Sequence, residues 1–125
     1  MAIDILDAFK HEPKPLEFVL PGLLPGTVGA LIAPGATGKS YLALETIMAI
    51  GCDKAGKDLL DLQPQDSGSA VYLALEDPEP VIWRRLHAIG AQLSPDVREA
   101  VAEKVHIEPL LGTDTNLMTE AGYAL

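Results

Sequence analysis

The sequence is short of cysteine, of aromatic residues and of positive charge, and each shortage excludes a class of protein. Cys52 is the only cysteine among 125 residues, so the chain can form no internal disulfide and no cluster of thiolate metal ligands. Aromatic residues make up 5% of the chain, so a core must be built from aliphatic side chains. Nine Lys and Arg against eighteen Asp and Glu give a net charge of −9, which excludes a protein whose whole surface coats nucleic acid.

The sequence also lacks an unbroken apolar run of membrane-spanning length. The longest uncharged stretch, residues 18–37, is interrupted by three prolines and four glycines, which predicts short pieces and no transmembrane helix. An acidic residue, Asp4, stands where a signal peptide would carry basic residues. Together with the single cysteine, these features predict a cytoplasmic protein that does not enter a membrane.

The chain divides into two parts of different character. Residues 1–26 form an N-terminal segment with a short apolar helical stripe, followed by turns rich in proline and glycine. In residues 27–125, apolar runs typical of buried strands alternate with helical patterns: the runs are at 27–33, 70–75 and 105–107, and the helices begin near 38, 78 and 94. This alternation predicts an α/β domain, a three-layer parallel sheet with helical crossovers.

The stretch after the first predicted strand has the pattern of a phosphate-binding loop, with Ala33 in place of the first glycine. Small residues let backbone N–H groups approach a triphosphate, and the following helix directs its positive end at the same anion. Lys39 would place a charge near the outer phosphates, and the Ser40 hydroxyl would bind Mg²⁺. The alternative is a strand–helix turn with an incidental lysine. The sequence therefore predicts ATP and Mg²⁺ as ligands, bound by Pro34, Gly35, Ala36, Thr37, Gly38, Lys39 and Ser40.

Two acidic residues, Glu76 and Asp77, follow the second predicted strand. Because parallel strands end at one edge of a sheet, these carboxylates should lie near the phosphate loop. Glu76 could hold an attacking water in line with the γ-phosphate or reach Mg²⁺ through water, which makes Glu76 and Lys39 the candidate catalytic residues. The alternative for Glu76 is a solvated strand end. For Asp77 we favour an N-cap of the next helix, because Pro78 follows it. We interpret Arg84 and Arg85 as a solvated helix face. The alternative is that they approach adenine or a neighbouring subunit.

The residues resemble a known family, the RecA-like hexameric replicative helicases of the plasmid RepA type. The resemblance implies a ring-forming, ATP-driven DNA helicase in which Lys39 and Ser40 serve the phosphates and Mg²⁺ and Glu76 polarises the attacking water. It covers most of the chain and rests on these motifs: Ile5-Leu6-Asp7-Ala8-Phe9, Val19-Leu20-Pro21, Gly26-Thr27-Val28-Gly29-Ala30-Leu31, Pro34-Gly35, Gly38-Lys39-Ser40, Tyr72-Leu73, Glu76-Asp77-Pro78, Arg85-Leu86-His87-Ala88 and Leu93-Ser94.

The resemblance also implies parts for which this sequence offers no candidate. RecA-like motors need a later strand that ends in a Mg²⁺-ordering aspartate, an arginine that reaches the neighbouring subunit, and DNA-binding loops. We therefore expect a truncated, amino-terminal half that binds nucleotide but is inactive alone as an enzyme. Single-stranded DNA would bind through the absent C-terminal half, and the complete protein would form a homo-oligomeric ring, a hexamer. The alternatives are a small P-loop kinase and a nucleotide-binding fragment without catalytic activity.

Overall fold

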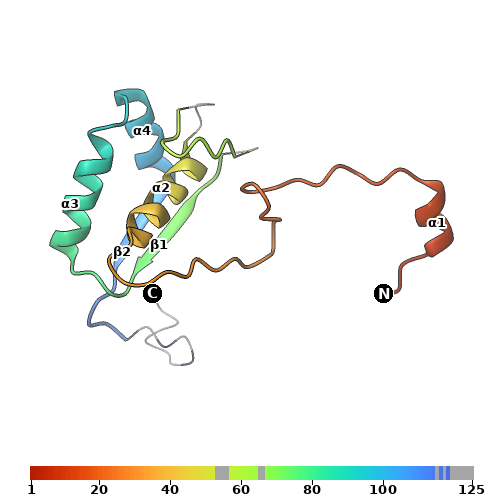
Figure 1. The fold of residues 1–125 in the computed structure, drawn as a ribbon, viewed down its shortest axis with the longest axis horizontal. Coiled ribbons are helices and arrows are strands. Elements are labelled where there is room, and N and C mark those ends of the chain that lie inside the picture. The colour runs from red at the N-terminus through yellow and green to blue at the C-terminus, as the bar shows by residue number, and fades with distance from the viewer. Residues whose placement is uncertain (53–56, 65–66, 115, 117, 119–125) are drawn as a thin grey trace.

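The body of the protein is a pair of parallel strands packed against three helices (Figure 1). The computed structural model describes residues 1–52, 57–64, 67–114, 116 and 118. The connection between the two strands runs through two helices, which confirms the predicted α/β class with parallel strands and helical crossovers. The elements are α1 (Ile5–Lys10), α2 (Lys39–Gly51), β1 (Ala70–Ala74), α3 (Glu79–Gly90), α4 (Pro95–Lys104) and β2 (Val105–Pro109).

Helix α2 begins directly after the predicted phosphate loop and runs through the centre of the body (Figure 1). Its N-cap residue is Gly38, and its apolar side chains pack against β1, β2 and α4. Leu44 and Ala49 are the most deeply placed of them, each with 1% of its surface exposed. The helix that the sequence predicts from Gly38 to Gly51 is confirmed.

The core lies on one face of the sheet. Strands β1 and β2 pair in parallel, with Tyr72 opposite Ile107 and Ala70 opposite Val105. The side chains of Tyr72, Val105 and Ile107 pack against a cluster that all three helices of the body supply. The buried members of this cluster are Leu44, Cys52, Ile89, Leu93, Val97 and Val101.

The other face of the sheet is uncovered in the described part of the chain. Val71 and Leu73, which alternate with Tyr72 along β1, have 60% and 53% of their surface exposed. Since α2, α3 and α4 all contribute to the single core cluster, the described residues form two layers and not the predicted three. The α/β class holds, but the second helical layer is missing from the described residues.

The strand predicted over residues 27–33 is not formed. Residues 27–33 form no strand, and the sheet of the described residues contains β1 and β2 alone. Val28 and Ile32 have 97% and 90% of their surface exposed. A strand needs a neighbouring backbone for its hydrogen bonds, and in the described part of the chain no strand pairs with this segment. The prediction from apolar composition was therefore wrong about the pairing.

The chain before residue 33 extends away from the body, with α1 at its far end (Figure 1). The short apolar stripe does form a helix there, capped by the Asp4 carboxylate, which accepts a hydrogen bond from the Asp7 N–H at 3.0 Å. None of the residues of α1 is buried.

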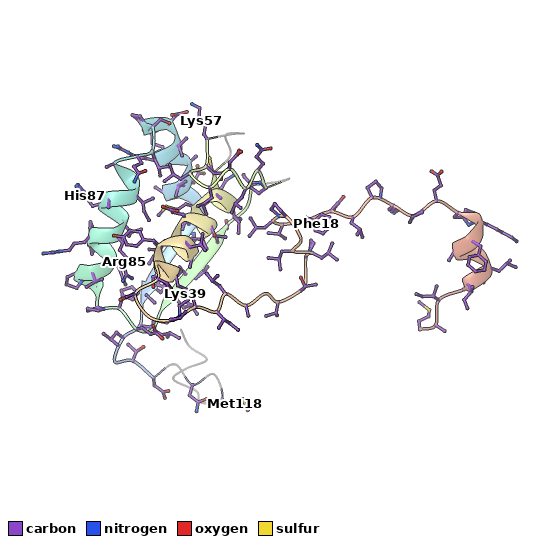
Figure 2. The ribbon with its side chains drawn as sticks, in the orientation of Figure 1. Phe18, Lys39, Lys57, Arg85, His87 and Met118 are labelled. Carbon is purple, nitrogen blue, oxygen red and sulfur yellow. The ribbon has the colours of Figure 1, made fainter. Side chains whose placement is uncertain are left out.

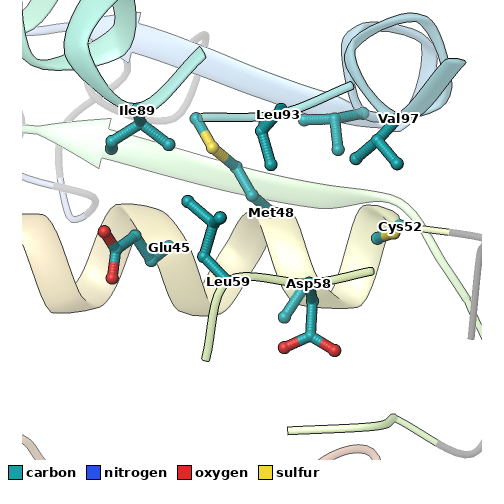
Figure 3. A pocket seen from close by; sticks show the side chains of 10 residues that line it. Glu45, Met48, Cys52, Asp58, Leu59, Ile89, Leu93 and Val97 are labelled. Atoms are coloured by element: carbon teal, nitrogen blue, oxygen red, sulfur yellow. The ribbon is translucent and has the colours of Figure 1, made fainter. Parts of the chain in front are cut away.

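A turn beside α2 closes one side of the core. The Asp58 carboxylate accepts hydrogen bonds from the backbone N–H groups of Leu62 and Gln63, at 2.8 and 3.4 Å. This turn lies over α2 and encloses a cavity of about 10 Å³ next to Met48 and Cys52 (Figure 3). Such a volume holds one water molecule at most, so the core is well packed here. No helix in the described ranges has the length and apolarity that crossing a membrane requires.

Candidate functional site

The loop between residues 33 and 39 has the backbone shape of an anion cradle. Ala36 and Gly38 both have positive φ angles, of 59° and 87°, so the chain reverses twice within three residues. The Thr37 hydroxyl donates a hydrogen bond to the Pro34 carbonyl at 2.7 Å and closes the loop on itself. Successive turns of this kind direct neighbouring N–H groups toward one point, where they can bind a phosphate.

The donors at the start of α2 are available to a ligand. The backbone N–H groups of Gly38, Lys39 and Ser40 bond to no acceptor in the described part of the protein, as expected for a helix N-terminus. The Lys39 ammonium likewise has no carboxylate partner among the described residues. The positive end of the helix and a free lysine therefore coincide.

The loop and the end of β1 face one cavity of about 490 Å³. In the sequence, a helix and a strand separate residues 34–40 from residue 76. The fold brings these two segments together at one site. Figure 2 labels two of its side chains, Lys39 and Arg85. All seven predicted nucleotide-binding residues line this cavity together with the predicted catalytic Glu76, and the further lining residues are Tyr41, Asp77 and Arg85.

The two acidic residues after β1 have different surroundings. Glu76 is exposed and forms no hydrogen bond or ion pair with a described residue. Asp77 is half-buried and pairs with Arg85, whose Nη1 and Nη2 donate to the two oxygens of the carboxylate, the second at 3.3 Å. The predicted Asp77 helix cap is wrong, because Pro78 is the N-cap residue of α3 and no side chain caps that helix end. Asp77 uses its carboxylate to hold Arg85 instead.

Arg85, which we interpreted from the sequence as part of a solvated helix face, lines the cavity of the candidate site. Its side chain has 21% of its surface exposed and lies over the ring of Tyr41, with 5.6 Å between the guanidinium carbon and the ring centroid. The interpretation as a solvated face holds for Arg84, which is exposed, and is wrong for Arg85. A signal was available: Arg85 is three residues after the buried Ile82 and four before the buried Ile89, so it belongs to the inward stripe of α3.

The donor set suits a nucleotide with Mg²⁺. Free N–H groups and Lys39 can bind phosphate oxygens, and the half-buried Ser40 hydroxyl is a hard oxygen ligand at the same helix start. Added Cβ atoms at Gly35 and Gly38 would meet no atom within 4 Å, so the space in front of the loop is open. In the parts of the chain that the structure describes, no group of three or more His, Cys, Asp or Glu could hold a metal. Ser40, Glu76 and Asp77 are oxygen-bearing side chains at this cavity that could face a cation bound with the phosphates, directly or through water.

A comparison with protein families agrees with this geometry. A family model described as an AAA domain matches residues 2–121. The chain belongs to the AAA domain family. Membership makes it a nucleotide-binding protein of the P-loop ATPase type, a class that generally binds its nucleotide with Mg²⁺. Within this AAA domain, the cavity between the loop and the end of β1 is lined by the residues of the phosphate-loop motif and by Glu76.

Proposed function

We propose that this AAA domain binds Mg²⁺-ATP in the cavity lined by residues 34–40, with Glu76 as the residue that activates water for hydrolysis. The observation that carries the proposal is the shared cavity, because it faces free N–H donors, an unpaired lysine and an unpaired carboxylate toward one volume. Phosphoryl transfer needs little more from a protein than positioning and charge stabilisation.

Each residue has a separate task in this proposal. The loop N–H groups and the Lys39 ammonium bind the β- and γ-phosphates, and the Ser40 hydroxyl is a ligand of Mg²⁺, which supplies charge neutralisation of the phosphates when bound. The Glu76 carboxylate accepts a hydrogen bond from the attacking water and takes its proton as the new P–O bond forms. The bond from the γ-phosphorus to the bridging oxygen breaks, and ADP leaves with phosphate.

Binding of Mg²⁺-ATP by the purified chain tests the first half of the proposal. Lys39→Ala should remove the heat of Mg²⁺-ATP binding in titration calorimetry, since the principal charge facing the phosphates is lost. Lys14→Ala is the matched control, because Lys14 is exposed in the extended segment outside the cavity. Unchanged nucleotide affinity in Lys39→Ala would overturn the proposal.

The role of Glu76 is tested by replacing its carboxylate with an amide of the same shape. Glu76→Gln should keep nucleotide binding and lower hydrolysis in the assembled protein by about 10²- to 10⁴-fold, the usual contribution of a general base. Glu99→Gln, an exposed position on α4, serves as the control. Full turnover in Glu76→Gln would remove this residue from the mechanism.

The motif resemblance supports a finer proposal, that the AAA domain serves an ATP-driven replicative DNA helicase that works as a hexameric ring. Contacts to the phosphates of DNA need Lys and Arg. The net charge of −9 therefore argues against single-stranded DNA binding by these 125 residues. We therefore assign DNA binding to sequence outside these 125 residues. Stimulation of ATP hydrolysis by single-stranded DNA in the assembled protein would support the helicase, whereas phosphate transfer to a small molecule would assign a kinase.

A further inference from the structure

The cavity contains an ion pair that binding of phosphate does not require. Arg85 and Asp77 join α3 to the end of β1, and their side chains have only 21% and 24% of their surface exposed. Both guanidinium nitrogens of the fork engage the carboxylate. Such a two-point, half-buried pair fixes geometry far better than an exposed ion pair does.

The pair is connected to the phosphate loop as well. Tyr41 follows Ser40 on the first turn of α2, and the Arg85 guanidinium lies over its ring. A cation over an aromatic face is attracted to it. Tyr41, Arg85 and Asp77 thus form a bridge from the helix after the loop to the residue beside Glu76, and all three line the nucleotide cavity.

We propose that Arg85 is a positioning residue that holds Glu76 at a fixed place relative to the phosphate loop. The inference rests on the proposed function, because it assigns Arg85 a task only if Glu76 acts on water. Glu76 is exposed and has no described partner of its own, so its place depends on the backbone on either side. β1 fixes the backbone before it, and the Asp77–Arg85 pair fixes the backbone after it.

A positioning residue should affect two ligands differently, whereas a purely structural ion pair should not. A positioning residue affects the state in which water is held against the γ-phosphoryl group and leaves binding of the diphosphate unchanged. A residue that touches the nucleotide affects both binding of the diphosphate and that reacting state. A residue that only stabilises the fold lowers the midpoint of unfolding and does not change the affinity for one ligand more than for the other. Mg²⁺-ADP and Mg²⁺-ADP with aluminium fluoride, a mimic of phosphoryl transfer, are therefore the two probes.

The experiment is calorimetric titration of the purified chain with both probes. Arg85→Met should leave the dissociation constant for Mg²⁺-ADP within about twofold and weaken the aluminium fluoride complex by about 10- to 100-fold, as expected when a reacting group is displaced. Arg85→Lys keeps the charge and loses the forked guanidinium, so its affinity for the aluminium fluoride complex should lie between those of the wild type and Arg85→Met. Arg84→Met, one residue along α3 and exposed, should match the wild type for both probes.

A double variant tests whether Arg85 acts through Glu76. If it does, Glu76→Gln with Arg85→Met binds the aluminium fluoride complex no more weakly than Glu76→Gln alone, because the two residues share one interaction. The inference would be overturned if the losses of affinity in Glu76→Gln and Arg85→Met added up in the double variant. It would also be overturned if Arg85→Met lost the same affinity for both probes. A Glu76→Gln variant that binds both probes like the wild type would instead overturn the proposed role of Glu76, and the inference with it. If Arg85→Met fails to fold, Asp77→Asn takes its place, because it removes the ion pair from the other end at constant shape. Asp77→Asn should then weaken the aluminium fluoride complex and leave Mg²⁺-ADP binding unchanged.

Discussion

At the scale of single residues, Gly38 sets the direction of the backbone where the loop enters α2. It is the N-cap of α2, and its φ of 87° lies in the left-handed region that L side chains rarely adopt. This conformation turns the chain from the loop into the helix and leaves the N–H groups of Lys39 and Ser40 facing the cavity. Backbone shape at one residue therefore decides where the donors of the helix N-terminus point.

A single added methyl group tests this point. Gly38→Ala should lower the free energy of unfolding by about 1–2 kcal/mol, the usual cost of a left-handed L residue. Gly35→Ala is the matched comparison, because its added Cβ meets no atom within 4 Å and its φ is not in the left-handed region. Urea unfolding of both variants gives the values, and an equal loss in the two would contradict the argument.

At the scale of elements, the central position of α2 makes its inward side chains the main support of the body. Leu44 has 1% of its surface exposed and belongs to the core cluster, whereas Leu42, two residues earlier, has 40% exposed. The same residue type thus lies on the inside and on the outside of a single helix.

This contrast predicts two very different costs of truncation. Leu44→Ala should lower the free energy of unfolding by about 2–5 kcal/mol, because it removes buried methyl groups and leaves a cavity. Leu42→Ala should cost about 0.5 kcal/mol or less, as surface changes do. Urea midpoints measure both, and similar losses for the two variants would mean that α2 does not pack as described.

The first turn of α4 carries a pH-dependent contribution to stability. The Ser94 hydroxyl donates to Asp96 at 2.6 Å and the Lys57 ammonium donates at 3.3 Å, and together they lower the pKa of Asp96 from 3.8 to about 2. A lowered pKa in the folded state stabilises the fold above the ordinary pKa, and this contribution disappears as pH falls through the folded value. Comparing urea midpoints of wild type and Asp96→Asn, we expect the wild-type advantage at about pH 5 to vanish near pH 2. A difference that does not change with pH would contradict this.

Most elements were predictable because their signals are local. The helix from residue 39, the two strands and the parallel pairing follow from apolar periodicity and turn residues, and the structure contains them. The strand at 27–33 could not be predicted, because pairing depends on a neighbour and not on composition. The Asp77–Arg85 pair was missed for a related reason: it joins a residue of the connection after β1 to a residue of α3 eight positions later, while Pro78 favoured a local cap for Asp77.

At the scale of the whole molecule, the protein is a small body with an extended N-terminal segment (Figure 1). Residues 11–17 are exposed and have no helix or strand, and α1 before them has no buried residue. The body therefore gains no core contacts from α1.

Limited digestion should separate the two parts. We expect a Glu-specific protease to cut after Glu17 before it cuts within the helices of the body, because proteases need an exposed, extended backbone. The product that begins at Phe18 should melt at the same temperature as the whole chain, within about 2 °C. Earlier cleavage at Glu45 on α2, or a clearly lower melting temperature, would show that the segment supports the body.

The uncovered sheet face has a consequence for handling the protein in solution. Val71 and Leu73 present apolar surface to water, and Val28 and Ile32 add to the exposed apolar residues. The solubility of the protein then depends on the repulsion between molecules that each carry a net charge of −9. Salt screens that repulsion, and acidification toward the isoelectric point of about 4.6 removes it. Dilute buffers of neutral pH and low ionic strength are thus the conditions under which turbidity stays lowest.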